Sequence, residues 1–515
     1  MNKFFVKFSV IFVLLSVTVF SGYGQAYDAS KDIHHYMMDK KDKHKLPTVP
    51  GRTYISSDEK IAVISGNSIK AVTDGDCDIY ALVDGQQSVF ARVTVGWQVQ
   101  NPVLPYSWDL NIPDCEAHAF NGKLYIYGSV DASNVFCSPY LIPVVTADLK
   151  RWESHGVAFS SFNDSLPYPK RMLWGSDVHF YNGKYLLYGA FEWFGGRSKD
   201  RSYVLESDNP MGPFKNFRWV TGNPSKKEID GITAKVFVEK DGSRYIIWAP
   251  TAQPVHENHL LIARLIENDV IDESSIKKIE GLKDFYEGPS IRKRGDIYYL
   301  IYNENCGAIT DKNHTPKRFS YATSKNITGE YVYRGVILTI EDIPGNTNIQ
   351  GSIEEFNGKW YAFYHRALNG VWNRRALCIE KIEFDRDGLI KPIVPTSSGI
   401  AEGLDTSKPI YFNTAVIQKN CRFSNDGKYG SAVVRDSAET GFRYVALTGK
   451  EKKISLQGEG LNNIIKVTVT ANGKIIGQGI GGQDIKLENV RKGKAELVLN
   501  ITANGEVKLE TLCFF

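Results

Sequence analysis

The sequence predicts an all-β fold, a five-bladed β-propeller with a smaller β domain on each side. The first observation is a short turn containing glycine that recurs five times and is each time followed by an aromatic, strand-forming run. The second is the spacing of these turns, whose glycines are 61, 59, 53 and 63 residues apart. The turns lie at Asn121-Gly122, Asn182-Gly183, Asp241-Gly242, Arg294-Gly295 and Asn357-Gly358.

Each turn is expected to join the first two strands of one blade. Asn-Gly and Asp-Gly between strand-like runs are strong hairpin signals, because a type I′ turn requires positive φ at both central residues. A period of this length without helical signals is typical of propeller blades. The first strand of every blade then lines a central funnel, where we expect the chemistry.

Three acidic residues occupy similar places in three of these repeats. Asp114 lies eight residues before the first turn glycine, Asp177 six before the second, and Glu287 eight before the fourth. We therefore expect one carboxylate each from three innermost strands, close enough to shift one another's proton affinities. Hydrolysis of a glycosidic bond needs such a group of acids, one to protonate the leaving oxygen and one to activate water.

The motifs around these acids, over residues 101 to 400, resemble glycoside hydrolase family 43. They are Ile112-Pro113-Asp114, Trp174-Gly175-Ser176-Asp177-Val178 and Glu287-Gly288-Pro289, supported by Asp148-Leu149-Lys150-Arg151-Trp152 and Pro210-Met211-Gly212-Pro213-Phe214. The resemblance implies an inverting glycosidase with Asp114 as general base, Asp177 as pKa modulator and Glu287 as general acid. It also implies plant-type polysaccharide or oligosaccharide substrates, with α-L-arabinofuranosidase or β-xylosidase activity favoured.

Two alternatives remain open at this stage. If the register of the first motif is misjudged, Asp109 or Glu116 would be the base instead of Asp114. A propeller that binds sugar without cleaving it would keep the same fold, but the presence of all three acids favours the enzyme.

Candidate sugar-binding residues come from aromatic positions near the predicted funnel mouth and from the resemblance. Trp108, Trp174 and Trp193 are expected to present rings to sugar C–H surfaces, and the resemblance places His118 and Asp131 at the border of the sugar subsite. His365 reads equally as a funnel residue or as a core histidine. Arg366 could bind sugar hydroxyls, or, like Arg374 and Arg375, it could pair with acids to close the ring. The candidate residues are Trp108, His118, Asp131, Trp174, Trp193, His365 and Arg366.

No cofactor is expected to be required. Many members of the family that the chain resembles hold a central calcium ion with a histidine early in blade five. This sequence has Gln350 at that position. An amide oxygen is a possible calcium ligand, so calcium stays a minor expectation.

The flanking segments and the composition set the context. Residues 1–24 read as a cleaved secretory signal, which predicts a secreted or periplasmic protein without a transmembrane segment. Residues 46–97 resemble a bacterial Ig-like domain, and residues 405–515 faintly resemble a β-sandwich carbohydrate-binding module. The chain has 62 basic and 58 acidic residues, a balance that argues against a nucleic-acid partner and leaves carbohydrate as the expected one.

Overall fold

The structure is a computed structural model, and it confirms an all-β chain. It describes residues 32–131, 137–162, 166, 173–191, 201–229, 231–250, 259–305, 318–341, 348–368, 374–424 and 429–515. Within these ranges the helical segments are 3-10 turns of three residues each. No helix in the described part of the chain is long and apolar enough to cross a membrane.

Five consecutive sheets form the central body. Blade one contains β8 (Glu116–Phe120), β9 (Lys123–Tyr127), β11 (Val144–Thr146) and β12 (Glu153–Ser154), beside the pair β10 (Tyr140–Leu141) and β13 (Phe159–Ser160). Blade two contains β14 (Leu173–Tyr181), β15 (Lys184–Phe191), β16 (Arg201–Ser207) and β17 (Lys215–Trp219). Blade three contains β18 (Thr221–Asn223), β19 (Ile232–Val238), β20 (Arg244–Ala249), β21 (Leu261–Leu265), β22 (Val270–Asp272) and β23 (Lys277–Lys278). Blade four contains β24 (Phe285–Arg294), β25 (Ile297–Glu304), β26 (Arg318–Ser324) and β27 (Val332–Thr339), and blade five contains β28 (Gly351–Phe356), β29 (Lys359–Ala367) and β30 (Arg375–Ile382).

The sheets close into a ring. The first strands β8, β14, β19, β24 and β28 contact one another in this order, and β28 contacts β8. Every pair of neighbouring blades shares a buried hydrophobic core. These cores contain Ile126 and Phe363 between blades one and five, Tyr125 and Leu187 between one and two, Leu186 and Ile246 between two and three, Ile247 and Leu300 between three and four, and Ile301 and Tyr364 between four and five. The body is therefore a five-bladed propeller with its first strands at the axis.

The turn glycines behave as predicted. All five have φ between 63° and 86°. In blades one, two and five the preceding Asn121, Asn182 and Asn357 also have positive φ, as a type I′ turn requires. Blade three differs because its hairpin has a longer loop, and Val238 pairs with Arg244 across it.

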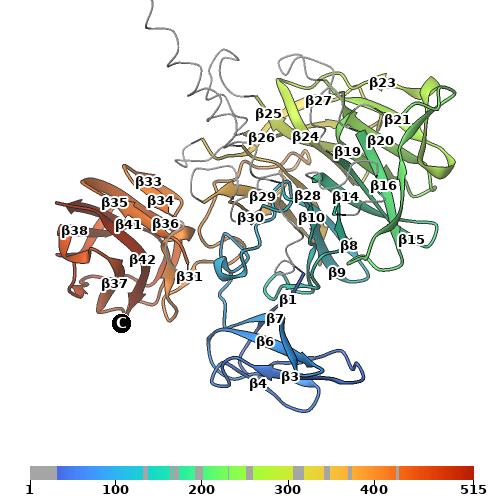
Figure 1. Cartoon of the computed structure of the whole chain (residues 1–515). Coiled ribbons are helices and arrows are strands. Elements are labelled where there is room, and N and C mark those ends of the chain that lie inside the picture. Colours follow the sequence, from blue (N-terminus) through green and yellow to red (C-terminus); the bar gives the residue numbers. More distant parts are fainter. Residues whose placement is uncertain are drawn as a thin grey trace, which may run out of the picture.

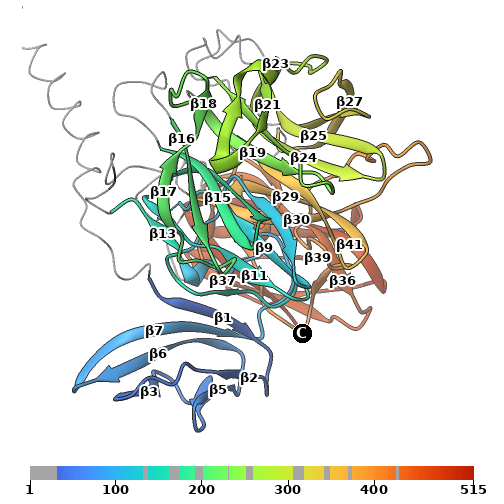
Figure 2. The ribbon, with the colours of Figure 1, turned by 90° about the vertical axis from the view of Figure 1, so that its right-hand side faces the viewer.

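An N-terminal unit continues the sheet of blade one (Figures 1 and 2). Its strand β1 (His34–Met38) pairs with β12 on one side and with β7 on the other, and it precedes residue 46, where the sequence predicts that this unit begins. The other strands are β2 (Lys43–Lys45), β3 (Arg52–Ser56), β4 (Ala62–Ile64), β5 (Ser68–Ala71), β6 (Gly75–Val83) and β7 (Gln86–Val95).

A C-terminal unit, coloured orange to red in Figure 1, lies beside the propeller. Its two sheets share one hydrophobic core that includes Phe412, Phe442 and Leu497. The strands are β31 (Leu404–Asp405), β32 (Ile410–Tyr411), β33 (Ile417–Lys419), β34 (Arg422–Ser424), β35 (Ser431–Val434), β36 (Ser437–Leu447), β37 (Lys453–Glu459), β38 (Ile464–Ala471), β39 (Lys474–Gly479), β40 (Ile485–Lys486), β41 (Gly493–Ala503) and β42 (Val507–Phe514).

Candidate active site

The axis-facing residues of the first strands form three levels, which can be counted from the hairpin turns. Alternate residues of a strand share one face, and two residues advance by roughly 6.6 Å. Blades one, two, four and five each contribute one residue of their first strand to the middle level. In each blade this is the residue that pairs with the fifth residue of the second strand. The middle level holds Glu116, Asp177, Ser290 and Ser352, and the lower level holds His118, His179, Arg292 and Glu354. Above the middle level, Trp174 and Glu287 are the next paired residues of their strands, each beyond a register shift. Asp114 and Gln350 lie two residues before Glu116 and Ser352, and these four residues are called the upper level.

Asp114 occupies the upper level in blade one and is held from several directions. Its side chain is buried, and its backbone has a left-handed φ of 56°. Ser129 Oγ donates to Oδ2 at 2.7 Å, and Arg375 Nη1 donates to Oδ1 at 3.3 Å. Burial raises the pKa of Asp114, but Arg375, His365 and the Ser129 hydrogen bond outweigh it, so that the pKa lies below its usual value. The carboxylate is therefore ionised at neutral pH and can accept a proton.

His365 and Arg375, both from blade five, orient Asp114. The backbone N–H of Asp114 donates to His365 Nδ1 at 3.0 Å, so the imidazole proton lies on Nε2, which is 3.1 Å from Asn348 Oδ1. Burial together with Arg375 lowers the pKa of His365 to about 3. Of the two readings of His365, the structure shows a fully buried residue that is bonded to the backbone of the proposed base.

Arg375 joins Asp114 to a second buried acid. Its Nε and Nη2 both donate to Asp131, each at 2.9 Å, in a bidentate pair. Asp131 is fully buried, so it does not border an open sugar subsite as expected. Its carboxylate positions Arg375, which in turn acts on Asp114.

Glu287 lies on β24, the first strand of blade four. Its side chain is half-buried, and Gln350 Nε2 donates to its Oε1 at 2.8 Å. It pairs with Asn303, which occupies the place in blade four that Ser129 occupies in blade one. Blades one and four are not neighbours in the ring, so the carboxyl groups of Asp114 and Glu287 approach the funnel from different sides.

Asp177 lies one level deeper than the other two acids, which corrects the expectation of equivalent positions. A register shift between Trp174 and Asp177 moves Trp174 into the upper level, where it pairs with Ala190. The Asp177 oxygens bind His118 Nε2 at 2.7 Å and His179 Nε2 at 2.9 Å, and Val236 N–H also donates to Oδ2.

Asp177 is ionised in this environment. Burial raises its pKa, but His179 and the hydrogen bonds from His118 and His179 together lower the pKa well below its usual value. Burial and Arg292 lower the pKa of His118 to about 4. His118 lies two levels below Asp114, and its imidazole contacts Asp177. Its place beside a sugar subsite stays a prediction.

Glu116, an alternative base, belongs to a buried ionic network at the middle level. Lys235 Nζ lies 3.0 Å from its Oε2, and Arg292 Nη2 and Ser290 Oγ each lie 2.8 Å from its Oε1. Arg292 also binds Glu354 through Nε at 2.6 Å. These contacts keep Glu116 in a structural role.

Two predicted sugar contacts instead join the flanking units to the propeller. Trp108 is buried, and its Nε1 donates to Thr94 Oγ1 of β7 at 2.9 Å. Arg366 is also buried, and its guanidinium donates to the backbone carbonyls of Ala415, Asn101, Asn413 and Thr414. Trp174 pairs with Ala190 of β15, and its role as a sugar contact stays a prediction. Trp193 lies outside the described residues.

The described residues near Gln350 do not fit a calcium site. Calcium takes about six to eight oxygen ligands, but the Gln350 amide donates its N–H to Glu287. Arg375 also places a cation beside the nearby Asp114.

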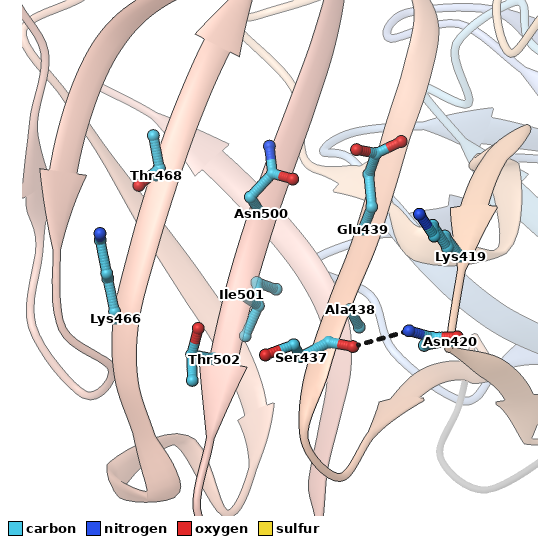
Figure 3. A pocket seen from close by; sticks show the side chains of 10 residues that line it. All are labelled: Lys419, Asn420, Ser437, Ala438, Glu439, Lys466, Thr468, Asn500, Ile501 and Thr502. Atoms are coloured by element: carbon cyan, nitrogen blue, oxygen red, sulfur yellow. Dashed lines mark hydrogen bonds between the residues drawn. The ribbon is translucent and has the colours of Figure 1, made fainter.

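A pocket on the C-terminal unit is separate from this site (Figure 3). It lies on an open sheet face across β33, β36, β38 and β41, and the lining side chains are mostly polar. Its ten lining residues include no aromatic ring for stacking on a sugar. One face of an antiparallel sheet is commonly solvated in this way, so the propeller funnel is the better candidate.

Enzymes that cleave glycosidic bonds by acid–base chemistry need two carboxyl groups, and Asp114 of blade one and Glu287 of blade four are the candidates for these roles. The profile of Glycosyl hydrolases family 43 matches residues 99–390. The chain belongs to this family and is a glycosidase.

Several known proteins are similar over most of their own length. The chain is 29% identical to a "Xylosidase/arabinosidase" of Thermoclostridium stercorarium over 447 residues, which are 73% of this chain and 89% of the relative. It is 29% identical to a "Xylosidase/arabinosidase" of Bacteroides ovatus, with 54% and 93% of the chains covered. A solved β-xylosidase/α-arabinofuranosidase from a compost microbial metagenome, in complex with xylotriose and in a calcium-free form, is 25% identical. That comparison covers 58% of this chain and 98% of the other, with a TM-score of 0.47.

Proposed function

We propose that the protein is an inverting glycosidase that removes arabinofuranosyl or xylosyl units from plant-type polysaccharides or oligosaccharides. The single observation that supports the mechanism is that Asp114, held by Ser129 and Arg375, and Glu287, held by Gln350, come from non-adjacent blades whose first strands meet at the axis. The names of the relatives, xylosidase and arabinosidase, support the sugar class.

In the proposed reaction, Glu287 gives its proton to the glycosidic oxygen as the bond from that oxygen to the anomeric carbon breaks. A water molecule attacks the anomeric carbon from the opposite face and gives a proton to Asp114. The two transfers form one alcohol and one sugar of inverted configuration. Arg375, Ser129 and His365 hold Asp114 ionised and oriented for this step.

The activity is tested with purified protein and aryl α-L-arabinofuranoside, β-D-xyloside and β-D-galactoside substrates. Release of the aryl group from the arabinofuranoside or the xyloside, but not from the galactoside, is expected. Sugar binding without turnover of any of the three would favour the non-catalytic propeller instead.

The role of Asp177 as pKa modulator remains a prediction, which Asp177→Asn tests. If the Asp177 charge raises the pKa of Glu287, its removal should move the alkaline limb of the pH–rate profile to lower pH and slow turnover by roughly 10²-fold. The contacts of Asp177 with His118 and His179 give the competing expectation, a lower melting temperature with the limb unchanged. The position of the alkaline limb separates the two roles.

A further inference from the structure

The lower part of the propeller axis contains a group of metal-ligand type, and two of its three residues, His118 and His179, have no part in the proposed reaction. His118 lies on β8, and Asp177 and His179 lie two residues apart on β14, so their side chains share one face. Their ligand atoms all lie within 4.8 Å of one another, and within the described residues this is the one group of three or more His, Cys, Asp or Glu side chains that meets this distance. Both Nε2 atoms are directed at the single carboxylate.

The charges around this group leave one carboxylate in excess. The buried cations of the axis, Lys235 and Arg292, are directed at Glu116 and Glu354. Three carboxylates therefore face two lysine or arginine cations, and Asp177 has the two imidazoles and a backbone N–H as its partners. A buried carboxylate needs a compensating charge.

We propose that His118, Asp177 and His179 bind a divalent transition metal ion of the zinc type at the base of the funnel. Two imidazole nitrogens and a carboxylate are a common ligand set for such ions and leave positions open for water. The ion would supply the missing positive charge and tie blade one to blade two one level below the catalytic acids. The His179 side chain is 13% exposed, which provides access from solvent.

The test is calorimetric titration of the full chain with ZnCl₂ after dialysis against a chelator. The wild type is expected to bind about one equivalent of zinc at this site. His179→Gln should weaken zinc binding by at least about tenfold, because mutating even a residue that only hydrogen-bonds to a metal ligand typically lowers metal affinity by about that factor. Glutamine can still donate a hydrogen bond to Asp177, so the variant removes the ligand nitrogen with little other change. Cobalt(II) in place of zinc should give visible absorption bands in the wild type that the variant loses.

The matched control is His155→Gln, which changes a histidine on blade one whose side chain is 41% exposed and which is not part of the group. It should bind zinc as the wild type does. His118→Gln provides a second variant in case His179→Gln does not fold, as judged by circular dichroism. Absence of binding in the wild type, or equal binding in wild type and folded histidine variants, would overturn the proposal. Neither result depends on glycosidase activity, so failure here is distinguishable from failure of the proposed function.

Discussion

Replacing Glu287 with glutamine should nearly abolish turnover of natural oligosaccharides and spare substrates with strongly acidic aryl leaving groups. A poor leaving group needs the proton that a general acid supplies, and that contribution is typically about 10²–10⁴-fold. An activated phenol leaves without it, so its rate should fall by less than about tenfold. Steady-state kinetics on xylo-oligosaccharide and dinitrophenyl glycoside measure the two losses side by side.

Glu355→Gln is a suitable control, because Glu355 is exposed on β28 and outside the funnel levels. It should behave as the wild type on both substrates. Equal losses on both substrates for Glu287→Gln would remove Glu287 from the role of acid.

Asp114→Asn should have a different signature, a loss of about 10²–10⁴-fold on natural and activated substrates alike. The base acts on the attacking water, so a better leaving group does not replace it. Asparagine also tolerates the left-handed backbone that Asp114 adopts, with φ of 56°, so the fold should be kept. The measurement is kcat on both substrates, with sugar binding followed separately.

Asp109→Asn is a closely matched control. Asp109 also has a left-handed backbone, with φ of 49°, and it binds Arg374 at 2.9 Å. It was the other aspartate that the sequence allowed as base. Near-normal kcat in Asp109→Asn together with the loss in Asp114→Asn is the expected pair of results, and the reverse pair would reassign the base.

The blades could be predicted from sequence because their signal is local. A turn with positive φ is marked by glycine or asparagine at two adjacent positions, and the strand-forming residues follow directly in the sequence. The level of Asp177 was mispredicted although the signal was present, since it lies six residues before its turn glycine whereas Asp114 and Glu287 lie eight before theirs. A shift of two residues along a strand leaves the side chain on the same face of the sheet but moves it to a different depth in the funnel.

The partners of Asp114 could not be predicted because they depend on ring closure. His365 and Arg375 are 251 and 261 residues away in sequence, and they reach Asp114 only when blade five packs against blade one. Trp108 and Arg366 were misassigned for the same reason. Both contact the flanking units, through Thr94 and Ala415, and no pattern in the propeller repeat indicates those contacts.

The stereochemistry of the first product tests the central claim most directly. Proton NMR during early hydrolysis of an aryl glycoside shows which anomer of the free sugar forms before mutarotation. Asp114 acting on water and Glu287 acting on the leaving oxygen predict a single displacement and an inverted first product. A first product of retained configuration would require a covalent glycosyl-enzyme intermediate and would contradict this account.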